Sequence, residues 1–250
     1  MKTFNVEAYK KLILSLKDSG RRLVSFADLP DDGTLLRLDV DYDPAWAARL
    51  AGINRECGAT GTFFVQAASP LYNLFSEDNL GAIRQIAESG QWIGLHFHHT
   101  SGQLDISRLE REVGILKMAA PEALRVVAWH NPPTDFSQIN LEAEKAGFIS
   151  AYADRFFGDG KYISDSNMRH DSDKIIQFAK NSGAPVIQVL LHPFNWVMGG
   201  DEMKEVLRRT FKNKFGQLAG EFSNNSVWRG GLGDEILGQM EKCPWYGGKP

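Results

Sequence analysis

Two aspartates near the start of the chain have a spacing that suits metal or acid–base chemistry. Asp39 and Asp41 end an apolar segment and lie two residues apart, so on an extended strand both side chains point to one face. Two carboxylates this close repel each other unless one is protonated or both share a cation. A purely structural alternative is that the strand ends here and turns into a helix cap. That alternative accounts for an aspartate at position 43 but not for one at position 39. The pair therefore indicates a functional site.

The histidines form the second candidate group. All 6 lie between residues 96 and 192, and most follow a predicted strand. Imidazole is a good ligand for borderline transition metals, and His96 and His98 would share one side of an extended segment. A turn beginning at Phe97 would favour His96 with His99 instead. With Asp41, either pair gives three protein ligands and leaves positions for water and substrate. We therefore expect a divalent cation.

Five further residues lie at or near the ends of predicted strands and could complete a site. His130 precedes a stiff Asn-Pro-Pro loop and could contact substrate, although a structural turn is equally compatible. His192 ends a strong strand and could donate a proton to a leaving group. Asp165 could form a polar wall of the site and contact substrate. Trp196 could stack on a sugar ring, although aromatic residues at strand ends more often belong to the core. His99 would also face the substrate.

Strands and helices alternate along the chain. Strands are predicted at 23–26, 35–41, 62–65, 92–95, 126–129, 148–152 and 186–190, and helices at 6–16, 44–57, 79–89, 106–116, 137–146, 172–181 and 203–211. Alternation of this kind indicates parallel βαβ units. About seven parallel strands favour a single-domain α/β fold, a closed or nearly closed barrel. Because active sites of such folds form at the carboxyl ends of the strands, the candidate residues should meet at one rim.

The bulk properties fit a globular protein of 250 residues. The 28 basic and 31 acidic residues give a net charge of −3, which offers no support for a nucleic-acid partner. No stretch approaches the length of an apolar membrane span. The first 20 residues lack the features of a secretory signal, so a cytoplasmic location is expected. The binding partner that we expect is therefore a small-molecule or glycan substrate and not a nucleic acid.

The motifs resemble the polysaccharide deacetylase superfamily, also called carbohydrate esterase family 4, over about residues 34–196. The segments that carry the resemblance are Asp39-Val40-Asp41, Thr62-Phe63-Phe64-Val65, Gly90-Gln91-Trp92-Ile93-Gly94-Leu95-His96 and Leu191-His192-Pro193. The resemblance implies a distorted (β/α) barrel core at 34–196, preceded by a helix and strand extension at 1–33 and followed by a helix and tail at 197–250. It also implies that Asp39 is the catalytic base, that Asp41 and His96 bind the metal, and that His192 is the general acid.

The chain departs from the family pattern at two places. The family's second histidine lies four residues after the first, which here is Thr100, and His130-Asn131-Pro132-Pro133 replaces the arginine-containing loop that orients the base. Both departures resemble a divergent branch in which the residue two after the first histidine is often acidic, and this favours His98 as the third ligand.

The activity that the resemblance implies is removal of an N-acyl group, most simply N-acetyl, from a sugar or related amine, and the divalent metal that it implies is Zn²⁺. An O-ester or another C–N bond could be hydrolysed at the same metal site. The remaining alternative is a glycan-binding barrel without activity, because a fold does not fix its chemistry.

Overall fold

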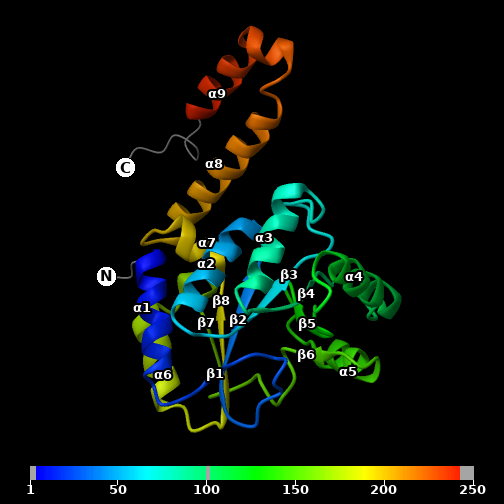
Figure 1. Cartoon of the computed structure of the whole chain (residues 1–250), viewed down its shortest axis with the longest axis vertical. Helices are drawn as coiled ribbons and strands as arrows, with labels where there is room; N and C mark the ends of the chain where they lie inside the picture. The colour runs from blue at the N-terminus through cyan, green and yellow to red at the C-terminus, as the bar shows by residue number, and fades with distance from the viewer. Residues whose placement is uncertain (1–3, 100–101, 243–250) are drawn as a thin grey trace.

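The chain folds around one parallel sheet, and the computed structural model describes residues 4–99 and 102–242 (Figure 1). Neighbouring strands follow the order β6-β5-β4-β3-β2-β8-β7, and β1 pairs with β2. The strands are β1 (Leu23–Val24), β2 (Gly33–Val40), β3 (Thr62–Val65), β4 (Trp92–Phe97), β5 (Val126–Trp129), β6 (Ile149–Ser150), β7 (Tyr162–Ser164) and β8 (Val186–Leu191). The predicted α/β barrel is confirmed as a curled, distorted half-barrel whose sheet ends at β6 and β7.

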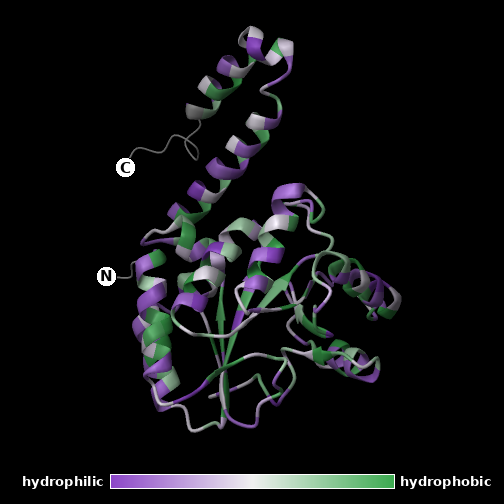
Figure 2. Ribbon diagram, viewed as in Figure 1, coloured by the Kyte–Doolittle hydropathy of each residue, from purple (hydrophilic) through white to green (hydrophobic). Residues whose placement is uncertain are grey.

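Most of the helices lie around the outside of the sheet. The helices are α1 (Val6–Lys17), α2 (Pro44–Glu56), α3 (Glu77–Glu88), α4 (Ile106–Ala119), α5 (Ser137–Lys145), α6 (Ser172–Asn181), α7 (Pro193–Met198), α8 (Met203–Glu221) and α9 (Gly233–Glu241), with the short helices η1 (Ser166–Met168) and η2 (Trp228–Leu232). Figure 2 shows hydrophobic strands inside and mixed helices around them. Helix starts follow local chemistry, since the side chains of Asn5 and Asp43 accept hydrogen bonds from the first turns of α1 and α2.

Strand β2 lies in the centre of the sheet and sets the position of both aspartates. All eight of its residues are buried, because β3 and β8 pair with its two edges and helices cover its outer face. Leu36 and Leu38 alternate with Arg37 and Asp39, so the two charged side chains share the inner face. They therefore occupy the interior of the half-barrel.

The C-terminal part contains more helix than the segment predicted at 203–211. The last predicted helix continues to Glu221 as α8, and α9 follows it after a turn that contains η2. Figure 1 shows that α8 and α9 form an arm that points away from the sheet. Over the residues that the structure describes, no helix is both long and apolar enough to span a membrane.

Glycine is required at position 94 by a close approach inside the barrel. A Cβ at Gly94 would lie 2.7 Å from Val126 Cγ1 and 2.9 Å from the Phe64 ring. We expect Gly94→Ala to lower the free energy of unfolding by about 1–3 kcal/mol, the usual cost of overpacking a core. Chemical denaturation measures this change.

Gly81→Ala is the matched control. Gly81 is exposed in α3, and no heavy atom lies within 4 Å of a Cβ built there. Alanine should stabilise that helix by about 0.5–1 kcal/mol. Equal stability of the two alanine variants would contradict the steric explanation.

Candidate metal and acid–base site

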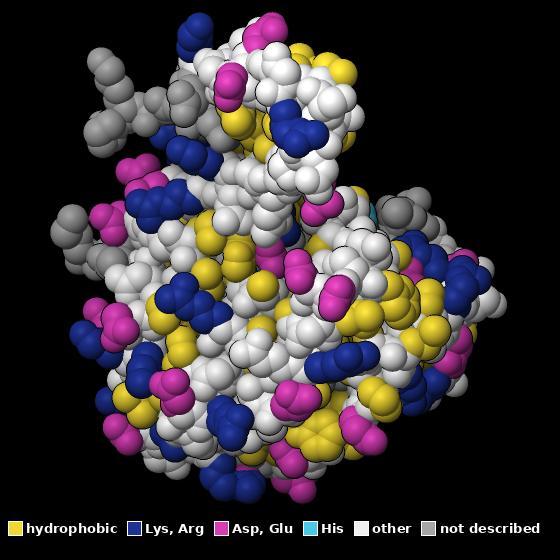
Figure 3. Space-filling model, turned by 45° about the horizontal axis from the view of Figure 1, so that its top comes forward, with side chains coloured by type: hydrophobic (Ala, Val, Ile, Leu, Met, Phe, Trp, Pro, Cys, Tyr) yellow, Lys and Arg dark blue, Asp and Glu magenta, His cyan; other side chains and the backbone are white. Residues whose placement is uncertain are grey.

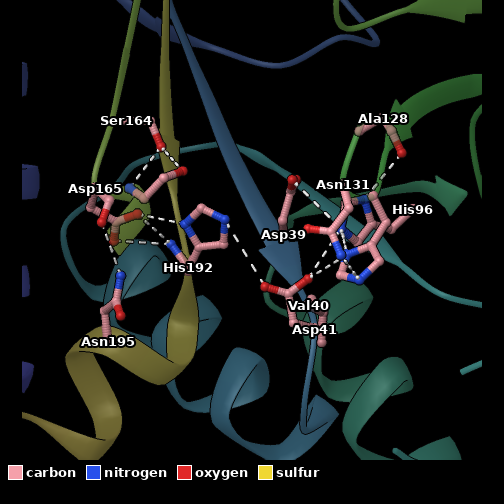
Figure 4. Close-up of polar contacts among 12 residues, drawn as sticks. Asp39, Val40, Asp41, His96, Ala128, Asn131, Ser164, Asp165, His192 and Asn195 are labelled. Carbon is pink, nitrogen blue, oxygen red and sulfur yellow. Dashed lines mark hydrogen bonds and ion pairs between the residues drawn. The ribbon is translucent and has the colours of Figure 1, made fainter. Parts of the chain in front are cut away.

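The predicted site residues come from neighbouring strands that run in the same direction. Asp39 lies on β2 and Asp41 follows it, His96 lies on β4, and His130 and His192 directly follow β5 and β8. Because the strands are parallel, their carboxyl ends form one rim, and Figure 4 shows Asp39, Asp41, His96 and His192 converging there.

Three side chains form a compact cluster of possible metal ligands. Asp41 Oδ1 lies 3.1 Å from both His96 Nε2 and His130 Nδ1, and these two nitrogens are also 3.1 Å apart. Ligand atoms around a tetrahedral zinc ion, with bonds near 2.0–2.1 Å, are about 3.3 Å apart. The one carboxylate oxygen and two imidazole nitrogens therefore fit a zinc-like cation in both spacing and chemistry.

A backbone contact orients the His96 ring toward this cluster. His96 Nδ1 lies 3.0 Å from the carbonyl oxygen of Ala128 and donates to it, which directs Nε2 at Asp41. With a cation bound, Nε2 would offer it a lone pair. This arrangement is typical of metal-binding histidines, whose second nitrogen is held by a carbonyl or carboxylate. His130 is held by its neighbour Asn131, whose amide lies 3.1 Å from His130 Nε2.

The cluster replaces the predicted ligand His98 with His130. Strand β4 ends at Phe97, so His98 leaves the extended path that would place it beside His96. His98 is exposed, and its ring packs 5.2 Å from that of His130. His130 enters the cluster because β5 is the neighbour of β4 in the sheet, a pairing that the spacing of the histidines does not reveal. Thr100, at the family's usual position, lies outside the described residues.

Asp39 is held by an arginine from its own strand. Arg37 Nε lies 2.8 Å from Asp39 Oδ1, and an Arg37 terminal nitrogen lies 2.7 Å from Oδ2, with both side chains almost fully buried. Burial alone would raise the pKa of Asp39, but the Arg37 charge and hydrogen bonds outweigh it and hold that pKa below its usual range. Sequence reasoning missed Arg37, although a charged residue on the same face of an apolar strand as Asp39 was a usable signal.

Hydrogen bonds also hold Asp41 in its ionised form. Burial would raise the pKa of this carboxyl, but the hydrogen bonds from His130 and His96, and the charge of His192, lower it well below its usual range. A carboxylate that stays ionised in a buried position is suited to binding a cation.

His192 faces Asp41 from the opposite side. Its Nε2 lies 4.0 Å from Asp41 Oδ2, while its Nδ1 lies 2.6 Å from Asp165 Oδ1. Burial would lower the pKa of His192, but the charges of Asp165 and Asp41 raise it to about 9. The ring is therefore protonated at neutral pH, with Nε2–H directed toward the cluster.

Asp165 and Trp196 support His192 and do not reach the cavity. Asp165 is fully buried and accepts hydrogen bonds from the His192 backbone N–H and from Trp196 Nε1 at 2.7 Å. The Trp196 ring packs 4.6 Å from the ring of Phe4 in the core. The prediction that these two residues contact substrate is thus corrected. His99 is half-buried and lines neither of the cavities described next.

Two cavities meet at the cluster. The inner cavity, about 280 Å³, has an aromatic lining that includes Trp129, Tyr152 and Phe157, and Asp39 forms part of its wall. The outer cavity, about 380 Å³, opens between the rim and α8. Both are lined by Asp41, Asn131, His130, Ser166 and His192. A substrate could therefore extend to both sides of the candidate metal position.

Comparisons with known proteins gave matches only among solved structures. No family model matches the chain, and no curated protein matches it. A CE4 family pseudoenzyme from Bacillus anthracis is 15% identical, with a TM-score of 0.47, over 74% of this chain and 60% of its own length. The chain thus spans less than two thirds of that protein.

Two other structures match a larger share of their own chains. A Streptococcus mutans CE4 esterase is 14% identical, with a TM-score of 0.48, over 90% of both chains. The chitin deacetylase of the fungal pathogen Colletotrichum lindemuthianum is 16% identical, with a TM-score of 0.46, over 72% of this chain and 81% of its own. These three solved structures are thus a CE4 pseudoenzyme, a CE4 esterase and a chitin deacetylase, and their likeness to this chain is one of fold.

Proposed function

We propose that the protein is a metal-dependent hydrolase that removes an N-acyl group, most simply N-acetyl, from a sugar or related amine. The observation that carries this proposal is the position of Asp41 between two different partners. On one side it meets His96 and His130, and on the other it faces His192, a protonated histidine held by a buried carboxylate. Ligands for a cation and a proton donor are what hydrolysis of an unactivated amide requires.

Asp41, His96 and His130 would hold the cation, whose chemistry is to polarise the acyl carbonyl and to lower the pKa of a water molecule. Asp39, in the wall of the inner cavity, is kept ionised by Arg37 and accepts the proton that the water gives up as its oxygen bonds to the carbonyl carbon. The C–N bond then breaks, and the departing nitrogen receives its proton from His192 Nε2. Asp165 fixes that direction because it occupies His192 Nδ1.

The ligand set makes a prediction about metal binding. His130→Ala should weaken zinc binding by more than about 100-fold, since the loss of a direct ligand exceeds the 10–100-fold effect of removing an outer hydrogen bond. His98→Ala, in the same wall of the outer cavity, should leave the affinity nearly unchanged. Competition with a chromophoric chelator measures both. Zinc lost in His98→Ala and retained in His130→Ala would restore the ligand set expected from the sequence.

The role of His192 predicts a dependence on the leaving group. With an N-acetyl amine as substrate, His192→Gln should lower kcat by about 10²–10⁴-fold, the usual contribution of general acid catalysis. A p-nitrophenyl ester, whose leaving group departs without a proton, should lose much less. Steady-state kinetics with both substrates test this, and equal losses would remove His192 from the role of acid. Zinc content measured beside the rates separates a lost proton donor from a lost metal.

The buried pair of Arg37 and Asp39 predicts a large stability effect. Arg37→Met leaves the Asp39 carboxylate buried without its partner, so the free energy of unfolding should fall by about 3–5 kcal/mol. The double variant Arg37→Met with Asp39→Leu should recover most of that loss, because no unpaired charge stays buried. Chemical denaturation measures both. A double variant as unstable as Arg37→Met would show that packing, and not charge pairing, sets the stability.

A further inference from the structure

An apolar groove runs beside helix α8, next to the candidate site. It has a volume of about 420 Å³, and its lining combines apolar side chains with the stems of basic ones. Leu71, Leu207 and Phe211 line it and are 47%, 43% and 46% exposed. Figure 3 shows hydrophobic side chains on the body of the molecule where the arm rises from it. Exposed apolar surface that gathers in one hollow indicates a binding site more than scattered single residues do.

The groove is continuous with the outer cavity. Tyr42, Leu71 and Leu207 line both hollows, and the outer cavity also contains Asp41 and His192. A single elongated molecule can therefore have one end at the candidate catalytic residues and the other end along α8. This shared wall identifies the occupant of the groove as part of the substrate.

Basic side chains lie along the same groove. Lys204, Arg208 and Lys214 line it, and Lys214 Nζ binds Asp43 at 2.7 Å. Within the part of the chain that the structure describes, neither Lys204 nor Arg208 forms an ion pair with a carboxylate. Two cations one helical turn apart beside an apolar hollow suit an anionic group that precedes an alkyl chain.

We propose that the substrate is an amphiphile, an N-acylated amino compound that carries an alkyl chain through an anionic linkage such as a phosphate. This inference rests on the proposed function. The acyl group would occupy the aromatic inner cavity, the amide would lie beside Asp41 and His192 where the two cavities meet, and the linkage would meet Lys204 and Arg208. The alkyl chain then lies in the groove, where burial of its methylene groups favours binding.

Chain-length dependence of binding tests this proposal without turnover. Butyl phosphate and octyl phosphate, both kept monomeric, are titrated calorimetrically into the protein with and without zinc. Burial of one methylene gives up to about four-fold in affinity. For four additional methylenes in an open groove we expect octyl phosphate to bind at least about ten-fold more tightly than butyl phosphate.

Two leucines of α8 provide a matched pair of variants. Leu207→Asp should abolish the preference for the octyl chain. Leu218→Asp should retain it, because Leu218, 54% exposed on the same helix, lies outside the groove. Circular dichroism verifies that both variants fold. Lys204→Gln with Arg208→Gln should weaken both phosphates and keep their ratio.

Three results would overturn the proposal. The first is equal binding of the two phosphates, and the second is an equal loss in the Leu218→Asp control, which would indicate general adsorption to the arm. The third is a wild-type dimer in light scattering that Leu207→Asp converts to a monomer, which would assign the groove to a second copy of the chain. Zinc binding and hydrolysis of a short N-acetyl amine are measured separately, so failure of the proposed function is distinguishable from failure of this inference.

Discussion

The buried ion pair between Arg37 and Asp39 is the constraint on which the interior of this protein depends. Two full charges in an apolar half-barrel are costly unless each is paired and its hydrogen-bonding groups are satisfied. The guanidinium meets this demand with both Asp39 oxygens, the Tyr152 hydroxyl at 3.1 Å and Gln188 Oε1 at 3.3 Å, and it lies 5.4 Å from the centre of the Phe64 ring. The interior is therefore arranged around a charged pair that fixes where Asp39 can lie.

A second carboxylate, Asp41, extends this arrangement to the rim. Each of the three histidines that approach it is held from behind, His96 by the Ala128 carbonyl, His130 by Asn131 and His192 by Asp165. These outer contacts set which nitrogen of each ring faces Asp41. Under the proposed function they would give chemically equal imidazoles different roles, His96 as a lone-pair donor to a cation and His192 as a proton donor. The distinction comes from the partners of the rings and not from the rings themselves.

Most of the fold could be predicted from local patterns. The segments 62–65, 126–129 and 172–181 have the predicted bounds in the structure, since runs of β-branched and aromatic residues and amphipathic helical spacing are properties of neighbours in sequence. The rim position of Asp39, Asp41 and the histidines also followed, because parallel strands place their carboxyl ends together. Of the C-terminal arm, only the start of α8 at 203–211 was predicted, because the residues from about 216 onward show no clean helical period.

Strand patterns along the chain were sufficient to predict that one aspartate pair and several histidines meet at one edge of a parallel sheet. Which of these side chains touch depends on the three-dimensional packing of the strands. His98 is nearer to His96 along the chain, but the strand ends before it, and sheet pairing brings His130 to Asp41 instead. Likewise Asp165 became the partner of His192 through the pairing of β7 with β8. Contacts between side chains depend on strand order and on where each strand ends, and spacing along the sequence encodes neither.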